Sequence, residues 1–309
     1  MNVRSTAILA PLSVGILLLA SACSGAPTAT DGKVSIVTAF YPLQFVAERV
    51  AGDHATVANL TTPGAEPHDL ELSPKQIASL SDADLVIYQS GFQAAVDAGV
   101  SQSSPAALFD VTTVVPLVDT GAHSGHAEDE GDEHADDLDP HLWLDPTNVA
   151  TIAGEVARQL GELDPANADD YDRKATELVA ELSTLDTDFR TGLARCERTE
   201  FITSHAAFGY LAKAYGLEQI GISGLSPDAE PSPARIAEIH TIATDLGVTT
   251  IFFETLVSPD TAKTIASDLG LRTDVLDPIE GITPDSKGDD YTEVMRANLT
   301  ALSTANGCS

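Results

Sequence analysis

Residues 168–193 read ADDYDRKATELVAELSTLDTDFRTGL, and this stretch decides how the rest of the chain is divided. Its apolar residues recur every three, four or seven positions, which is one face of a helix with 3.6 residues per turn. A helix of about 26 residues is about 39 Å long, enough to cross two lobes as a rigid strut. Two shorter helices broken near Asp186 are the alternative. The apolar residues are Tyr171, Leu178, Leu182, Leu185, Phe189 and Leu193.

Short β-rich runs alternate with helical patterns on both sides of this stretch. Before it, strands are expected at 34–37, 55–60 and 84–88, and helices at 41–51 and from Ser73-Pro74 onward. Serine is a preferred N-cap and proline suits the first helical turn, so Ser73-Pro74 is a helix start. After it, strands are expected at 200–203, 218–222, 248–253 and 272–276, and helices at 207–215, 233–246, 259–269 and 291–305.

This alternation of strands and helices predicts α/β structure with mainly parallel sheets. The expected fold has two lobes, each with a mainly parallel sheet flanked by helices, joined by the long helix. We expect an N-terminal lobe at 33–165, the linker helix at 166–194 and a C-terminal lobe at 195–309.

The composition is that of a folded and strongly acidic protein. Of its 309 residues, 43% are hydrophobic, which is enough for real cores. There are 47 Asp and Glu against 16 Lys and Arg, a formal net charge of −31. Such a chain repels nucleic acid and attracts cations. Its 3 cysteines are too few for a four-cysteine zinc module.

The N-terminus has the pattern of an export signal. Arg4 precedes an apolar run at 7–19. This run is shorter than the roughly 20 apolar residues that a transmembrane helix needs. The following LASAC at 19–23 resembles a bacterial lipobox, although Ala20 stands where leucine is commonest. We therefore expect a signal peptide at 1–22, lipidation of Cys23 and a flexible tether at 23–32. Ordinary cleavage near Ala22, which would release a free protein, is the alternative.

Residues 119–139 form an unusual acidic segment. It holds nine acidic residues, no lysine or arginine, and the histidines His123, His126 and His134. Without an apolar face it should be a solvated loop. Carboxylates concentrate cations and imidazoles bind transition metals, so the segment is interpreted as a low-affinity metal-capture loop rather than a plain acidic loop.

Several polar residues follow the predicted strands. His68 lies after the second strand, His205 ends the segment FITSH, and Asp277 ends VLD. Ligands of open α/β sheets bind beyond the carboxyl ends of the strands, so a site in the cleft between the lobes is our hypothesis. His54, in a turn, and His240, within a predicted helix, are interpreted as structural residues.

Four sequence segments together resemble one protein family. They are EPHDLELSP at 66–74, DPHLWLDP at 139–146, TSHAAFGY at 203–210 and LDP at 276–278. In this order they are similar to the ligand segments of the zinc and manganese solute-binding proteins of bacterial ABC transporters (cluster A-I, zinc-uptake branch). The resemblance covers essentially the whole mature chain, including the long helix and the acidic loop.

The resemblance implies that His68, His141, His205 and Asp277 bind the metal. Three imidazoles and one carboxylate suit tetrahedral Zn²⁺. Histidine at the third place, His205, points to zinc, whereas glutamate there is associated with manganese in this family. Glu280 or a water molecule could complete the site in place of Asp277. Candidates for hydrogen bonds to the ligand imidazoles are Glu66, Asp69 and Glu254.

The function that the resemblance implies is an extracytoplasmic zinc receptor, not an enzyme. It would deliver Zn²⁺ to an ABC permease and its ATPase, be held at the membrane by its lipid, and act as a monomer. A zinc chaperone is a further partner to consider. A manganese receptor is one alternative. Others are a zinc hydrolase, although the chain has neither HExxH nor GxSxG, and an adhesin or structural lipoprotein.

Cys196 and Cys308 are the two cysteines left after Cys23. In an exported chain two such cysteines are expected to form a disulfide. Two free thiols near the surface are the alternative.

Overall fold

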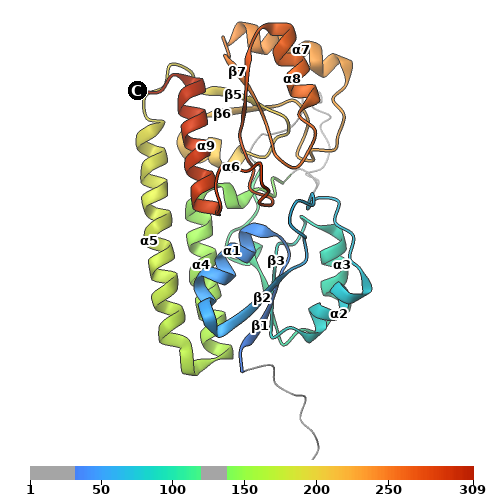
Figure 1. Ribbon diagram of the computed structural model, residues 1–309, viewed down its shortest axis with the longest axis vertical. Helices are drawn as coiled ribbons and strands as arrows, with labels where there is room; N and C mark the ends of the chain where they lie inside the picture. The colour runs from blue at the N-terminus through green and yellow to red at the C-terminus, as the bar shows by residue number, and fades with distance from the viewer. Residues whose placement is uncertain (1–31, 120–137) are drawn as a thin grey trace, which may run out of the picture. The chain divides into compact units, whose positions relative to one another are not determined.

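The computed structural model of the chain describes residues 32–119 and 138–309. Within these ranges lie two four-stranded parallel sheets, each flanked by helices, with a long helix packed beside both sets (Figure 1). The predicted fold class is thereby confirmed. The expected signal peptide and Cys23, and the histidines His123, His126 and His134, lie outside the described residues.

The N-terminal sheet has the strand order β2-β1-β3-β4, and all of its pairs are parallel. The central strands β1 and β3 consist mostly of buried apolar residues, as expected for a parallel sheet covered on both faces. Helices α2 and α3 lie on one side of the sheet and α1 on the other (Figure 1). The elements are β1 (Val34–Thr38), α1 (Tyr41–Ala51), β2 (Ala55–Asn59), α2 (Pro74–Asp82), β3 (Leu85–Tyr88), α3 (Ala94–Gln102) and β4 (Ala107–Asp110).

The C-terminal sheet repeats this arrangement with the order β6-β5-β7-β8, again all parallel. Helices α7 and α8 cover one face through a small apolar core, and α9 contacts β5 and β8. The elements are β5 (Glu200–Thr203), α6 (Gly209–Tyr215), β6 (Glu218–Gly221), α7 (Pro233–Asp245), β7 (Thr250–Phe253), α8 (Asp260–Leu269), β8 (Arg272–Val275) and α9 (Tyr291–Asn306).

Along the chain, α4 (Pro146–Leu163) and α5 (Ala168–Gly192) follow the N-terminal sheet and precede the C-terminal one. Helix α5 is unbroken, so the single-helix prediction is confirmed and the break near Asp186 is wrong. It packs against α1 and α4 and also against α9. Four 3-10 helices complete the elements of the described ranges: η1 (Gly52–His54), η2 (Val111–Thr113), η4 (Leu142–Leu144) and η5 (Pro165–Asn167).

Among the α-helices and strands of the described ranges, α3, β4 and α4 were not predicted. The small residues of α3 give it a weak apolar face, and β4 is short and only partly buried. Helix α4 does carry a helical apolar stripe, from Val149 through Val156 to Leu160, so its sequence pattern is that of an amphipathic helix. It packs against α1 and α5, and α1 in turn contacts β1 and β2 of the N-terminal sheet.

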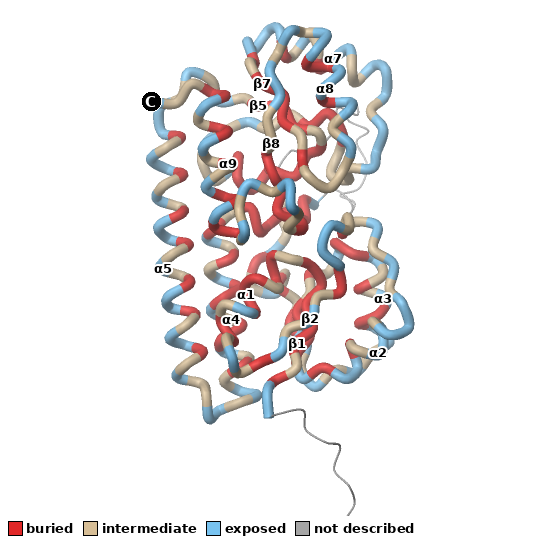
Figure 2. The backbone as a smooth tube through the Cα atoms, viewed as in Figure 1, coloured by how far each residue is buried: buried red, intermediate tan, exposed pale blue. Residues whose placement is uncertain are grey.

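One apolar core extends across both lobes (Figure 2). Trp143, which is fully buried, donates from Nε1 to the carbonyl of Pro278 at 2.7 Å. Tyr291, at the start of α9, donates from its hydroxyl to the carbonyl of Trp143 at 2.6 Å. Because these contacts join segments before and after α5, the two sheets share a continuous interior.

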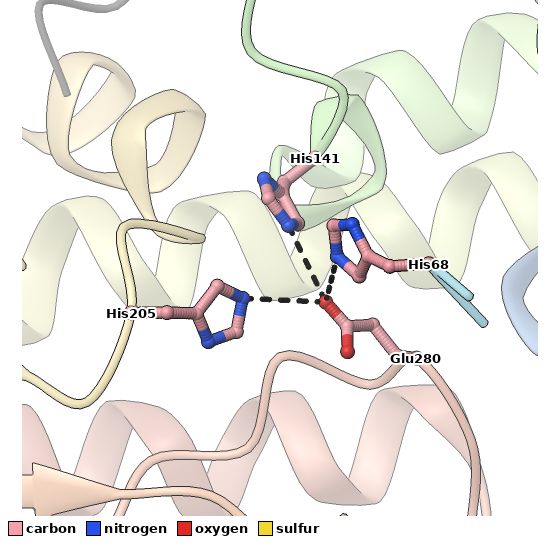
Figure 3. A group of neighbouring side chains, drawn as sticks. All are labelled: His68, His141, His205 and Glu280. Atoms are coloured by element: carbon pink, nitrogen blue, oxygen red, sulfur yellow. Dashed lines mark hydrogen bonds and ion pairs between the residues drawn. The ribbon is translucent and has the colours of Figure 1, made fainter. Parts of the chain in front are cut away.

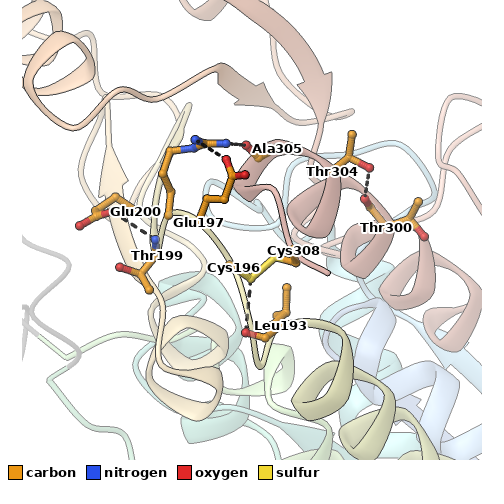
Figure 4. The surroundings of a disulfide bond; sticks show 10 residues. Leu193, Cys196, Glu197, Thr199, Glu200, Thr300, Thr304, Ala305 and Cys308 are labelled. Atoms are coloured by element: carbon orange, nitrogen blue, oxygen red, sulfur yellow. Dashed lines mark hydrogen bonds and ion pairs between the residues drawn. A yellow bond between two sulfur atoms is a disulfide. The ribbon is translucent and has the colours of Figure 1, made fainter.

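The expected disulfide between Cys196 and Cys308 is present (Figure 4). It joins the segment ahead of β5 to the residue that follows α9 by two, across 112 positions of sequence. The backbone N–H groups of Glu197 and Arg198 both donate to the carbonyl of Asn306 nearby. The C-terminus is thus fastened to the C-terminal sheet. In the described part of the chain, no helix has both the length and the apolar character that a membrane crossing requires.

Candidate metal site

Three histidines and one glutamate converge at a single point (Figure 3). One potential ligand atom from each of His68, His141, His205 and Glu280 lies within 4.8 Å of the others. The Nε2 atoms of His68 and His141 are each 3.3 Å from Oε1 of Glu280, and Nε2 of His205 is 3.4 Å from the same oxygen. All three rings therefore direct Nε2 toward one carboxylate.

The chain topology explains this convergence. His68, His205 and Glu280 lie in the loops that follow β2, β5 and β8, beyond the carboxyl ends of parallel strands. Such loops gather at one edge of each sheet. His141 instead precedes the 3-10 helix Leu142–Leu144, which leads into α4. Two of the four side chains thus come from before α5 and two from after it.

The four side chains are almost completely removed from water. The side chains of His141, His205 and Glu280 are at most 1% exposed, and that of His68 is 11% exposed. Nε2 of His141 and Nε2 of His205 have only these ion-pair contacts with Oε1 of Glu280 and form no hydrogen bond, and Oε2 of Glu280 is buried without a hydrogen-bond partner. Buried polar atoms without partners are costly and rare. A cation at the centre would satisfy them, and three imidazoles with one carboxylate are a donor set that suits zinc, so these residues form a potential metal site.

Buried carboxylates orient two of the rings from behind. Nδ1 of His141 donates to Oδ1 of Asp139 at 2.7 Å, and Nδ1 of His205 donates to Oε1 of Glu254 at 2.7 Å. Histidines that bind metals commonly have such a partner on the other ring nitrogen. Glu254 was among the residues considered for this place, whereas Asp139 was missed. The sequence signal that could have identified Asp139 is its position two residues before His141. In the structure, Oδ1 of Asp139 also accepts from the backbone N–H of His141.

Burial and neighbouring charges shift the pKa of all four side chains. Burial alone would raise the pKa of Glu280, but the three imidazoles hold the pKa of this carboxyl well below its usual value. Burial would lower the pKa of His205, but Glu254 and Glu280 raise it well above its ordinary value. Asp139 and Glu280 likewise outweigh burial and raise the pKa of His141. His68 lacks a second carboxylate partner, and burial lowers its pKa.

Glu66 contacts the loop of His68 and is not one of the four converging side chains. Its Oε1 accepts from the backbone N–H of His68 at 2.7 Å, which holds the loop rather than the ring. Burial, with the nearby charge of Glu280, raises the pKa of Glu66 to about 8.

The structure corrects the expectation for Asp277. Its carboxylate does not join the imidazoles, because both of its oxygens are hydrogen-bonded within the C-terminal lobe. Oδ1 accepts from the N–H of Ile279 at 2.8 Å, and Oδ2 accepts from Ser286 at 2.9 Å and Thr255 at 3.2 Å. Glu280, three residues further on, occupies the place beside the histidines.

Side-chain amides fix the three histidine loops. The buried Gln93 donates to the carbonyl of Pro67 at 3.1 Å, and the buried Gln89 donates to the carbonyl of Pro140 at 2.6 Å. Gln219 donates to the carbonyl of His205 at 3.0 Å. Each loop is therefore held at its histidine or at the residue before it, and the imidazoles are positioned before any ligand arrives.

This arrangement can hold a cation but offers little for hydrolysis. Catalytic zinc sites keep one coordination position open for water, whereas structural and storage sites are closed by protein donors. Here a carboxylate lies opposite the three imidazoles and would take the fourth position. The geometry therefore favours binding over catalysis.

Comparison with known proteins places this geometry in a family. Residues 36–305 match the family model ZnuA, described as zinc-uptake complex component A, periplasmic. The chain is 36% identical to the high-affinity zinc uptake system protein ZnuA of Bacillus subtilis strain 168, across 92% of this chain and 93% of that protein. It is 38% identical to the zinc-binding lipoprotein AdcA of Streptococcus pneumoniae strain R6, across 93% of this chain but 60% of AdcA.

Solved structures agree with this assignment. The Zn(II)-bound ZnuA-like domain of Streptococcus pneumoniae AdcA is 34% identical, with a TM-score of 0.75, across 89% of this chain and 99% of that domain. The laminin-binding protein Lmb of Streptococcus agalactiae is described as bifunctional, with adhesin and metal-transporting activity. It is 33% identical, with a TM-score of 0.77, across 88% of this chain and 99% of that protein.

Proposed function

Since the chain belongs to the ZnuA family of zinc-uptake binding proteins, we propose that it captures Zn²⁺ outside the cytoplasm through His68, His141, His205 and Glu280. The members of this family are zinc-binding proteins of uptake systems, not enzymes. The observation that carries the proposal is the convergence of three Nε2 atoms on one buried carboxylate oxygen.

Each residue has a distinct part in this proposal. His141 and His205 are held rigidly by Asp139 and Glu254 and provide two fixed nitrogen ligands. Glu280 supplies the negative charge that the cation needs. His68 has the most exposed side chain of the four, so it is the ligand that incoming zinc meets first. When zinc binds, it replaces the contacts that Glu280 makes with the imidazoles in its absence.

The proposed partner is an ABC-type permease with its ATPase, to which the zinc is delivered. Two ligands precede α5 and two follow it, so release requires the two pairs to separate. The shared core at Trp143 and Tyr291 limits that separation to a small movement. We expect the chain to act as a monomer and to receive zinc from solution or from a zinc chaperone.

Two further proposals concern residues outside the described ranges. Lipidation of Cys23 would anchor the mature chain at the outer face of the cell membrane. The histidines His123, His126 and His134, within their acidic segment, would bind zinc weakly and raise its concentration near the tight site.

Manganese is the alternative cargo, and the donor set argues against it. Mn²⁺ prefers oxygen ligands, with six donors in octahedral geometry, whereas imidazole suits zinc. Three nitrogens and one carboxylate around a small buried centre therefore favour zinc.

A competition titration tests the proposal. The metal-free mature protein is titrated with Zn²⁺ and with Mn²⁺ against a chromophoric chelator, beside His205→Ala and the control His240→Ala, whose histidine lies on α7 outside the site. We expect one tight zinc site, weaker additional sites, poor manganese binding, a strong loss in His205→Ala and no change in His240→Ala. Tight zinc binding that survives His205→Ala would refute the proposed site, and absence of any tight zinc would refute the function.

A further inference from the structure

The backbone immediately before Glu280 has an unusual conformation. Ile279 has φ of 58°, and it is the single residue other than glycine with positive φ in the ranges 32–119 and 138–309. A β-branched residue in the left-handed region is a genuine outlier, and such outliers persist only where the surroundings enforce them. Ile279 is also fully buried, so its neighbours must hold both its backbone and its side chain.

Hydrogen bonds of Asp277 and Asn298 hold the backbone at Ile279 in this conformation. Oδ1 of Asp277 accepts from the N–H of Ile279 at 2.8 Å, which closes a turn around Pro278. Asn298, on α9, brackets the backbone of Asp277: its Oδ1 accepts from the Asp277 N–H at 2.9 Å, and its Nδ2 donates to the Asp277 carbonyl at 2.7 Å. Both side chains are only 2% exposed.

Further contacts fix the residues on either side of this turn. Ser286 and Thr255 donate to Oδ2 of Asp277, and Trp143 donates to the carbonyl of Pro278. The loop is therefore held by α9, by the chain after β7 and by the 3-10 helix that follows His141. The residue that emerges from this turn is Glu280, whose Oε1 contacts all three imidazoles.

We propose that Asp277 and Asn298 are positioning residues, which set the carboxylate of Glu280 against the three histidines by locking Ile279 in its left-handed conformation. This rests on the proposed zinc site. Asp277 acts on the metal through the turn and not as a ligand. Without the hydrogen bonds of Asp277 and Asn298, the backbone at Ile279 relaxes toward ordinary φ and ψ angles. The carboxylate of Glu280 is then no longer held at one position beside the imidazoles.

Zinc titration of Asp277→Ala and Asp277→Asn tests this role. In Asp277→Asn, the amide oxygen still accepts from Ile279 and the amide nitrogen can donate to the hydroxyl oxygens of Ser286 and Thr255, so near-native affinity is expected. In Asp277→Ala the dissociation constant should rise about ten- to hundredfold, the usual range for loss of an outer partner. With Co²⁺ as a probe, Asp277→Ala should also change the visible spectrum of the four-coordinate ion.

Matched variants separate positioning from stability. Leu302→Ala removes a fully buried side chain from α9 without touching Asp277, so it should lower the melting temperature but leave zinc affinity unchanged. Ser286→Ala removes one hydrogen bond to Asp277 and should lower the affinity for zinc severalfold. This variant tests the same role if Asp277→Ala does not fold. Melting of each metal-free variant is recorded beside its affinity.

Zinc titration of the wild-type chain and of Glu280→Gln distinguishes failure of the proposed function from failure of the positioning role. If the wild type has no tight zinc site, the proposed function is wrong. If the wild type binds tightly but Asp277→Ala and Ser286→Ala bind as well as Leu302→Ala, the positioning role is wrong. If Asp277→Asn is as weak as Glu280→Gln, Asp277 is a direct ligand and the inference is overturned.

Discussion

Nδ1 of His205 donates to Oε1 of Glu254 across 2.7 Å, and both side chains are at most 2% exposed. The same carboxylate oxygen also accepts from the hydroxyl of Ser204 at 2.6 Å. Because one ring nitrogen is committed to Glu254, the other must face Glu280. The contact thus fixes both the orientation of His205 and the nitrogen that it presents to a metal.

Glu254→Gln is expected to weaken zinc binding about ten- to hundredfold. The amide carries no charge, so it supports a metal-bound imidazole less well and can also turn its NH₂ group toward Nδ1. Chelator competition measures the change. Glu238→Gln on α7, which removes the negative charge from a surface partner of Arg235, is the control and should bind zinc normally. Equal affinity of the two variants would contradict the role of Glu254.

Zinc affinity should fall steeply as the pH is lowered. The buried carboxylates raise the pKa values of His141 and His205, so both imidazoles gain protons in the metal-free protein even above pH 6.5, the ordinary value. Zinc binds neutral imidazole and must displace those protons. Below both raised pKa values, the apparent dissociation constant should rise up to about a hundredfold per pH unit, since about two protons are released.

Titrations between about pH 5.5 and 8.5, with proton release measured in buffers of different ionisation enthalpy, check this dependence. The pKa of His68 is lowered, so His68 adds a third proton only at the acidic end. Affinity that stays constant over this range would contradict the charge coupling described for the site.

Loss of the Cys196–Cys308 disulfide should destabilise the fold substantially. It closes a loop of 112 residues, and the chain-entropy model gives up to about 5 kcal/mol for a loop of this length. The double variant Cys196→Ser and Cys308→Ser should unfold at lower denaturant than the oxidised wild type. Reductant should lower the wild-type midpoint to that of the variant and leave the variant unchanged. A wild-type midpoint that is insensitive to reductant would show that the bond contributes little.

Deleting residues 121–137 should leave the tight site intact. The N–H of Asp139 donates to the carbonyl of Val118 at 3.1 Å, so these two described residues on either side of the deleted segment already lie together, and the three residues that remain between them can join them. Asp139 keeps its contact with His141. Stopped-flow capture at low zinc should be slower, with the equilibrium affinity within about threefold of wild type if the extra sites only raise local zinc. Loss of tight binding would contradict a dispensable capture loop.

The sequence predicted those features that depend on local patterns. The apolar stripe of residues 168–193 gave a single helix because its spacing is set by the helix itself. The β-rich runs predicted the strands β1, β2, β3 and β5–β8 to within two residues at either end. The residues of the central strands β1, β3, β5 and β7 are mostly buried, as is usual for parallel strands covered on both faces. His68, His141 and His205 were identified because the segments that carry them resemble the ligand segments of one family, and the fold brings these three together.

The choice between Asp277 and Glu280 could be made only by the tertiary structure. The two carboxylates lie three residues apart in one loop, and no local pattern says which of them faces the histidines. That depends on Asn298 and Ser286, on the 3-10 helix that carries Trp143, and on the positive φ of Ile279 that their contacts enforce. The sequence by itself thus determined most of the elements, because these follow from short-range spacing, and it indicated the three imidazoles through the resemblance of their segments to one family. The carboxylate and its buried supports came from contacts between residues up to 212 positions apart, which only the folded chain brings together.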